Sequence, residues 1–141
     1  MAQQDRATND ELRILIQKVA RRIKAERSDE HVTDSQLGVL WRLEKLGACT
    51  PGQLADLEKV RPPSMNRTVN ALEEAGYVER SPAPDDARKV LVNLTESGRR
   101  VTTETRRLRA VWFEHQLAAL GEEENAALAA VIPILRRIAE S

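Results

Sequence analysis

The chain has 141 residues, enough for one small domain with an appended dimerisation element, and its 41% content of hydrophobic residues is typical of a soluble globular protein. Lysine and arginine number 22, and so do aspartate and glutamate, which excludes a uniformly basic nucleic-acid-binding surface but leaves room for a local basic patch. The single cysteine excludes an internal disulfide, and together with only two histidines it argues against a Cys/His metal site.

Capping boxes mark the starts of the first two predicted helices. Residues 8–11 (TNDE) and 33–36 (TDSQ) each place a threonine three residues before a Glu or Gln, so that both side chains can accept from free backbone N–H groups. Apolar residues follow the first box at helical spacing, from Leu12 to Ile23. The second helix is expected to end at Gly47.

Two short helices come next. Residues 50–53 (TPGQ) form a third capping box, with proline at the favoured first helical position, and predict a helix that ends near Val60. Pro62 and Pro63 then open a fourth helix, which Gly76 is expected to end. Its apolar residues have the spacing i, i+4, i+7 and predict one buried face, made of Met65, Val69 and Leu72.

The hydrophobic period then changes from that of a helix to that of a strand. Residues 77–81 and 89–94 predict two short strands, in the second of which Val90, Val92 and Leu94 alternate to one side. The loop between the strands, residues 82–88, is polar and contains two prolines. We therefore expect a hairpin with a projecting tip.

Two further helices complete the chain. Thr95 is expected to cap a long helix over about residues 96–120, which Gly121 breaks. The three glutamates at 122–124 suit the positive N-terminus of a last helix. Pro133 lies inside that helix and is expected to kink it or to remove one backbone hydrogen bond.

This order of elements predicts a mainly α fold with a small β-hairpin wing. Residues 33–95 are interpreted as a winged helix-turn-helix DNA-binding unit, in which the fourth helix reads the DNA. Residues 1–32 and 96–141 are interpreted as N- and C-terminal dimerisation helices, because an apolar face that one chain cannot bury is buried against another. The alternative is a monomer in which these helices pack on their own winged unit.

The polar face of the fourth helix is the first candidate DNA contact. Because the apolar residues define its buried side, the opposite side is expected to enter the major groove. Arginine, asparagine and serine are the side chains that hydrogen-bond base edges and phosphates there. The candidates are Ser64, Asn66, Arg67 and Asn70; the alternative is a solvated helix face.

The hairpin tip is the second candidate contact. An arginine at such a tip, Arg88, suits the narrow and electronegative minor groove. Asp86 can hydrogen-bond this arginine or the loop backbone and so orient it, and Lys89 is expected to add attraction to phosphates. The alternative for residues 86–88 is an ordinary polar turn.

Three stretches of the chain resemble the MarR family of bacterial transcriptional regulators: residues 50–55 (TPGQLA), residues 64–80, which end in LEEAGYVER, and residues 86–98 (DARKVLVNLTESG). The last of them resembles that family's wing and is fairly specific, whereas many regulators share the helix-turn-helix. The prolines at 62, 63 and 133 are not general features of the family.

The resemblance implies a homodimeric repressor, less often an activator, that binds a palindromic site in double-stranded DNA. It places the helix of residues 62–75 in the major groove and Arg88 in the minor groove. It also implies a small effector, phenolic or an aromatic carboxylate, bound between the dimerisation helices and the winged unit. The sequence names no effector-binding residue.

Some family members sense oxidants through a cysteine near the N-terminus. Cys49 is instead at the staple position before the third helix, where a small buried hydrophobic residue is expected. The two histidines, His31 and His115, are expected to be structural or solvent-facing. Trp41 and Trp112 are expected in the core.

The sequence leaves two alternatives to a DNA-binding regulator, a protein-binding module and an enzyme. A winged-helix module that binds protein and not DNA is the main alternative, and the zero net charge favours it. An enzyme is disfavoured, because the sequence has no glycine-rich phosphate loop, metal-ligand cluster or nucleophile–base arrangement, and no cofactor is expected. The polar N-terminus and the longest apolar run, residues 126–135, predict a cytoplasmic protein without a membrane span.

Overall fold

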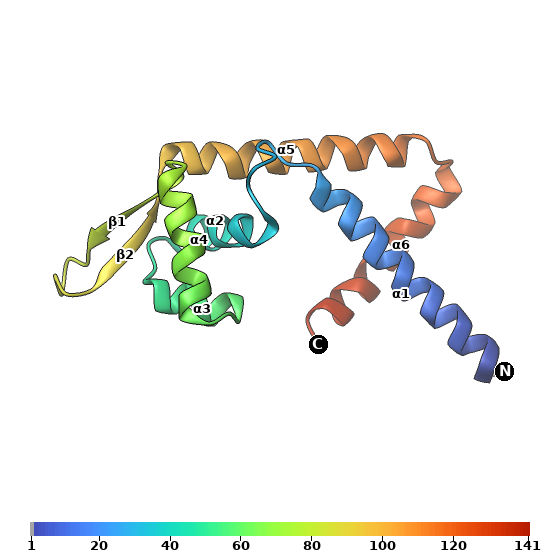
Figure 1. Cartoon of the computed structure of the whole chain (residues 1–141). Coiled ribbons are helices and arrows are strands. Elements are labelled where there is room, and N and C mark those ends of the chain that lie inside the picture. Colours follow the sequence, from blue (N-terminus) through green and yellow to red (C-terminus); the bar gives the residue numbers. More distant parts are fainter. Residues whose placement is uncertain (1) are drawn as a thin grey trace.

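The structure is a computed structural model that describes residues 2–141. Within these residues the elements follow one another in the predicted order, with a two-stranded antiparallel sheet as the only sheet, which confirms the mainly α fold with a hairpin wing (Figure 1). The elements are α1 (Ala2–Ala25), α2 (Asp34–Leu46), α3 (Pro51–Glu58), α4 (Pro62–Glu74), β1 (Val78–Pro82), β2 (Val90–Leu94), α5 (Glu96–Ala118) and α6 (Glu122–Ala139).

Two of the three predicted capping boxes are present. Thr33 Oγ1 accepts from the Gln36 N–H at 3.1 Å, and Gln36 Oε1 accepts from the Thr33 N–H at 3.0 Å. Thr50 and Gln53 repeat this pair of bonds at 3.1 and 2.8 Å. Each box satisfies backbone donors that the first turn leaves free, so α2 and α3 begin where their sequence predicts.

The predicted start of the first helix was wrong. α1 begins at Ala2, and Thr8 therefore lies inside the helix. A threonine in a helix interior costs only a few tenths of a kcal/mol to about 0.7 kcal/mol. The residues before it include good helix formers, and Asp5 in the first turn suits the positive end of the helix dipole.

The hydrophobic core lies between the three short helices and the base of the sheet. The predicted buried face of α4 is confirmed, since its three apolar residues are at most 2% exposed. They pack with the inner faces of α2 and α3 and with the sheet in one cluster. The fully buried aliphatic residues of this cluster include Leu37, Leu40, Leu43, Leu54, Met65, Val69, Leu72 and Val92.

The wing is tied to the core at its base and free at its tip. β1 and β2 pair antiparallel, from Val78 opposite Leu94 to Pro82 opposite Val90. Cys49 adds a short bridge, accepting from the Val92 N–H at 2.7 Å and donating to its carbonyl at 3.2 Å. Val90 was expected on the buried side, but it is 41% exposed because the hairpin has already left the core at this position (Figure 1).

The first turn of α5 is joined tightly to the end of α4. Thr95 caps α5 as predicted, accepting from the Gly98 N–H at 3.1 Å and donating to the Gly76 carbonyl at 2.7 Å. Gly98 lies so close to the backbone of Tyr77 that an added Cβ would be 2.2 Å from its carbonyl oxygen. The long helix is therefore held directly against the C-terminal end of the predicted reader helix.

The helices at the two ends of the chain do not pack on the winged unit. α5 extends away from that unit, and α1 and α6 descend from its far half (Figure 1). α6 continues through Pro133 without interruption, and none of its described side chains is buried. α5 packs on the winged unit through its first half, whereas α1 and α6 do not cover that unit as the monomer alternative would have them do.

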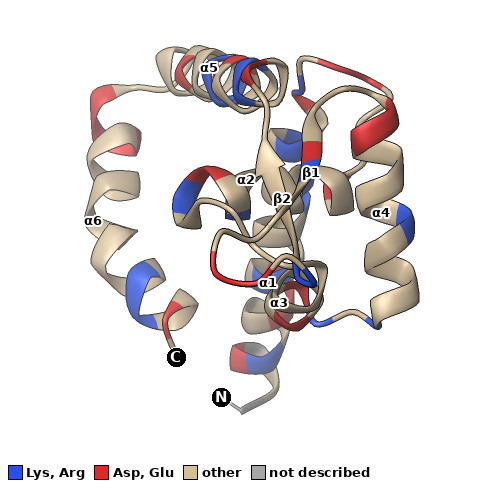
Figure 2. Ribbon diagram, turned by 90° about the vertical axis from the view of Figure 1, so that its left-hand side faces the viewer, with Lys and Arg blue, Asp and Glu red and all other residues tan. Residues whose placement is uncertain are grey.

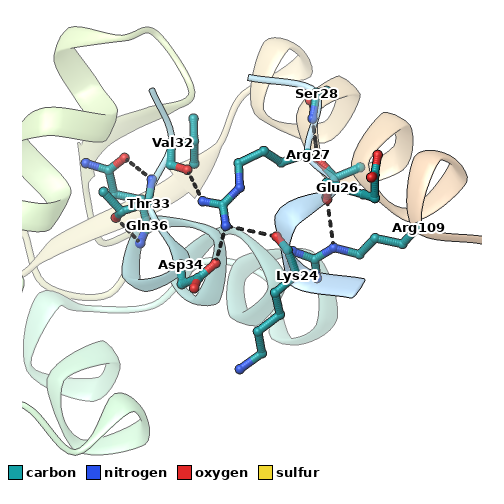
Figure 3. A network of polar contacts seen from close by, with 10 residues as sticks. Lys24, Glu26, Arg27, Ser28, Val32, Thr33, Asp34, Gln36 and Arg109 are labelled. Carbon is teal, nitrogen blue, oxygen red and sulfur yellow. Dashed lines mark hydrogen bonds and ion pairs between the residues drawn. The ribbon is translucent and has the colours of Figure 1, made fainter. Parts of the chain in front are cut away.

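Two arginines hold the joint where α1, α2 and α5 meet (Figure 3). Arg27 donates to the Lys24 carbonyl at 2.9 Å and pairs with Asp34, at the start of α2, at 2.6 Å. Arg109 of α5 donates to the carbonyls of Lys24 and Glu26 at 3.3 and 3.0 Å. The Lys24 carbonyl in the last turn of α1 thus accepts from both arginines, which join the end of α1 to α2 and α5.

Candidate nucleic-acid interface

The outer face of α4 presents the four predicted polar residues together. Asn66, Arg67 and Asn70 are exposed and Ser64 is half-buried, opposite the buried face of the same helix. Arg67 is within 3.5 Å of the Ser64 hydroxyl, a long contact that leaves most of its guanidinium donors free. The acidic residues of α4 are confined to its C-terminal end, near α5 (Figure 2). A phosphate that approaches the N-terminal end of α4 therefore meets no acidic residue of this helix.

The first turn of α4 follows from its two prolines. Pro62 and Pro63 occupy the first helical positions, where their missing N–H groups leave no unsatisfied donor. Arg61 precedes them in extended geometry and is exposed. The positive end of the helix dipole and the arginine charge therefore coincide, which favours an anion such as a phosphate.

The wing tip presents an arginine in a defined orientation. Asp86 Oδ1 accepts from the Arg88 backbone N–H at 3.0 Å and from its Nε at 3.1 Å, which confirms the predicted contact. The Arg88 side chain is nevertheless 91% exposed, although its Nη2 makes a further, long contact with Asp86 Oδ2 at 3.4 Å. The Lys89 N–H donates to the Asp86 carbonyl at 3.0 Å and closes the turn.

The carboxyl group of Asp86 at the tip is charged at neutral pH. The Arg88 side chain, and then its backbone N–H, hold the pKa of the Asp86 carboxyl below its usual range. Because that pKa is lowered, Asp86 stays charged at neutral pH, and the contact is lost only when the pH falls through the lowered value.

One residue of this surface was missed by sequence reasoning. Arg80 on β1 donates to Glu73 Oε1 at 2.9 Å and to Asn70 Oδ1 at 2.8 Å, and so connects the wing to α4. The alternation of the strand could have revealed it: Arg80 lies two residues after the buried Val78 and therefore faces the same side of the sheet. An arginine on the inner side of a strand needs acceptors on the neighbouring element.

The structure brings the candidate residues together in two groups. Ser64, Asn66, Arg67 and Asn70 share one face of α4, while Asp86, Arg88 and Lys89 share the wing tip, which projects away from α4 (Figure 1). Arg80 is the residue by which the base of the wing contacts the first group.

Cys49 is 5% exposed, as expected for a small buried hydrophobic residue. Burial raises the pKa of its thiol, which disfavours the reactive thiolate that an oxidant sensor needs. His31 and His115 are both exposed.

The tryptophans were expected in the core. Trp41 is half-buried and packs against the core cluster, whereas Trp112 is half-buried and is not part of that cluster. Arg106 lies 5.1 Å from the centre of the Trp41 ring, and Arg22 lies 5.5 Å from that of Trp112. A cation above a ring covers part of it in each case.

Among residues 2–141 no group of three or more His, Cys, Asp and Glu side chains is arranged to hold a metal ion. Over the same residues no helix combines the length and the apolar character that crossing a membrane requires.

Known proteins resemble this chain along most of its length. The family described as MarR matches residues 32–90. Mb0904 of Mycobacterium bovis, an uncharacterised HTH-type transcriptional regulator, is 38% identical over 89% of this chain and 87% of its own length. MdtR of Bacillus subtilis, an HTH-type transcriptional repressor, is 27% identical over 92% of this chain and 84% of its own length.

The fold of the chain also matches that of a solved structure. A putative transcriptional regulator from Pseudomonas aeruginosa superposes with a TM-score of 0.79 at 33% identity, covering 98% of this chain and 96% of the other. The likeness thus extends beyond the winged unit to the terminal helices.

Proposed function

The chain belongs to the MarR family of DNA-binding transcriptional regulators, and from that premise we propose that it acts as a homodimeric repressor of a palindromic operator, released by a small ligand. The observation that carries this proposal is the pairing of two surfaces on one chain. One is a polar helix face and arginine tip suited to DNA. The other is a set of apolar helix faces without a partner in the same chain.

The unpartnered apolar faces support a homodimer. Large aliphatic side chains on α1 and α6 are between about one third and two thirds exposed, although they recur at helical spacing. Monomeric proteins rarely expose so continuous an apolar surface, and two-fold pairs are the commonest oligomers. The residues concerned are Leu12, Leu15, Ile16 and Val19 of α1, with Leu128, Val131, Ile132, Leu135 and Ile138 of α6.

The proposed division of labour follows the chain. Residues 33–95 form the DNA-binding unit, and residues 1–32 and 96–141 supply the dimerisation helices. α5 connects the two functions, because Val101, Thr102 and Thr105 at its start are buried while its second half lies outside the winged unit. Movement of the dimer arms would therefore displace the reader helices.

A two-fold dimer would present two copies of α4, the reader helix, to one face of the DNA. Two such helices enter successive major grooves when they lie roughly 34 Å apart, which requires a palindromic site. Ser64, Asn66, Arg67 and Asn70 would meet base edges and phosphates, while Arg88 of each wing would enter the flanking minor groove with Asp86 orienting it. Lys89 would add phosphate attraction.

Selection of bound sequences from a random DNA pool tests this function. We expect a site with two-fold symmetry whose half-sites are separated by about one helical turn. The same preparation should sediment as a dimer. A protein that stays monomeric, or that shows no sequence preference at low ionic strength, would contradict the proposal.

The wing contact is tested by Arg88→Ala. We expect operator affinity to fall at least about tenfold, because each wing loses an arginine from a groove that concentrates negative potential. The dependence of binding on salt concentration should also become shallower, since fewer counterions are released. Titrations at two salt concentrations measure both effects.

Lys89→Ala is the matched control, since it removes a neighbouring charge of the same sign. It should weaken binding to all sequences by a similar factor and leave base preference unchanged. Unchanged affinity of Arg88→Ala at both salt concentrations would mean that the wing does not enter the groove.

A hollow of about 460 Å³ at the joint of α1 and α2 supports ligand control. Its cationic side chains outnumber Asp34, its one acidic residue, so a small aromatic carboxylate suits it. It is lined by Gln17, Ala20, Arg21, Lys24, Ala25, Arg27 and Asp34. A ligand there that prefers another arm position would weaken DNA binding by its difference in affinity for the two shapes.

Repression follows if the operator overlaps a promoter, and the name of the Bacillus subtilis relative supports it. Ligand control would be refuted by equal operator affinity with and without every small aromatic carboxylate that binds the protein.

A further inference from the structure

Arg80 contacts α4 in two chemically different ways. Glu73 accepts from both its Nη1 at 2.9 Å and its backbone N–H at 3.2 Å. Asn70 accepts from its Nη2 at 2.8 Å. The Glu73 carboxylate already balances the arginine charge, and Val78 of β1 packs in the core with the buried face of α4, so the bond to Asn70 is additional to what attachment of the wing requires.

The bond from Arg80 determines which end of the Asn70 amide it faces. A guanidinium has only donors, so the amide must turn its oxygen toward Arg80. Asn70 is exposed on the outer face of α4, and its amino group is then the part left for another partner. The Asn70 amide, which can both donate and accept, is therefore presented to an outside partner mainly as a donor.

This orientation changes what Asn70 can recognise. Asparagine reads adenine by accepting from N6 while donating to N7, which needs the oxygen and the amino group together. Here the oxygen is turned toward Arg80 and one of its two lone pairs is occupied, while the adjacent positive charge of Arg80 repels the amino hydrogens of adenine. Guanine O6 and N7 and thymine O4 are acceptors, which an amino group beside a cation favours.

We propose that Arg80 is a specificity-determining residue that makes Asn70 select guanine or thymine and not adenine at its operator position. Arg80 itself acts as a positioning residue, through the amide that it orients. The inference rests on the proposed function, since it requires α4 to lie in the major groove.

The position read by Asn70 is found first. Selection from a random pool with wild-type protein and with Asn70→Ala should differ at one symmetric pair of positions, where wild type prefers guanine or thymine about fivefold and the variant has no preference. A preference for adenine there, or no changed position at all, would overturn the proposal.

Asn70→Asp then tests the donor role without disturbing the wing, because a carboxylate still accepts from Arg80. The atom left for DNA becomes an acceptor, so the preferred base at that position should change to cytosine or adenine, whose major-groove edges donate. Overall affinity will fall because of phosphate repulsion, so the readout is base preference and not affinity. An unchanged preference would overturn the proposal.

Arg80→Met tests the orienting role, since methionine keeps the apolar stem but cannot donate. With the amide freed, adenine should become an accepted base at the Asn70 position, by about fivefold relative to wild type. Loss of affinity without any change in the base preferred at the Asn70 position would overturn the role of Arg80. If Arg80→Met disorders the wing, Asn70→Asp still tests whether Asn70 acts as a donor.

Glu73→Gln is the matched control, because it weakens the attachment of Arg80 but leaves the Asn70 bond possible. It should keep the wild-type base preference. If wild-type protein selects no sequence at all, the proposed function fails; if it selects a symmetric site and only the Asn70 position departs from expectation, the present inference alone fails.

Discussion

Ile132→Glu is expected to convert the protein to a monomer and to abolish operator binding. Ile132 is 51% exposed in the single chain and lies amid the apolar face of α6. A dimer would bury two copies of the introduced carboxylate without a partner, at a cost of roughly 4 kcal/mol or more. This cost raises the dimer dissociation constant at least about a thousandfold.

Loss of the dimer removes the advantage of two linked half-sites, which is typically on the order of 100-fold to 10,000-fold in affinity. Sedimentation measures the oligomeric state, and titration of the selected operator measures the affinity. Ala126→Glu is the matched control, since it introduces the same charge on the opposite side of α6. A dimeric Ile132→Glu with unchanged operator affinity would show that this face is not the interface.

Gly98→Ala is expected to destabilise the fold strongly. The added Cβ would lie 2.2 Å from the Tyr77 carbonyl oxygen and 2.6 Å from Leu94 Cδ1, so the start of α5 must separate from the end of α4. Overpacking of this kind costs about 1–3 kcal/mol and sometimes more. Because a backbone carbonyl cannot rotate away as a side chain does, we expect a loss of about 3 kcal/mol, or roughly 10 °C in melting temperature.

Gly52→Ala provides the comparison, because it makes the same exchange in the first turn of another helix. Its nearest neighbour would be Thr50 Oγ1 at 3.8 Å, an ordinary contact. Alanine is the better helix former by up to about 1 kcal/mol, so this variant should melt at the same temperature or higher. Both melts must use one protomer concentration. Equal melting of the two variants would refute a tight contact at Gly98.

The proposed ligand control and the proposed reading of DNA by α4 both depend on the contacts between the end of α4 and the start of α5. Thr95 and Gly98 hold the long helix on the Gly76–Tyr77 backbone, and the Tyr77 hydroxyl donates to Asp29 Oδ2 at 2.5 Å, in the connection that leads from α1. The segment that follows α4 is thus hydrogen-bonded both to the start of α5 and to the connection that leads from α1. Under the proposed ligand control, these contacts are where a movement of the arms would reach α4.

Most of the winged unit could be predicted from sequence because its signals are local. The capping boxes at Thr33 and Thr50 join residues three positions apart, and the buried face of α4 follows from the helical repeat. The bond from Asp86 to Arg88 also spans only two residues, so the wing tip could be anticipated. The assignment of these residues to DNA contact stays a prediction.

Tertiary structure decided whatever depends on residues distant in the chain. The early start of α1 is an exception with a local cause, since a cap is a weak preference within a longer helical stretch. Arg80 meets Asn70 only once β1 has folded back along α4. The sequence by itself determined the helices, their order and the buried side of the reader helix. Only the folded chain decided which polar groups face one another and that α1 and α6 turn away from the winged unit. Those outcomes depend on long-range contacts, which no local pattern encodes.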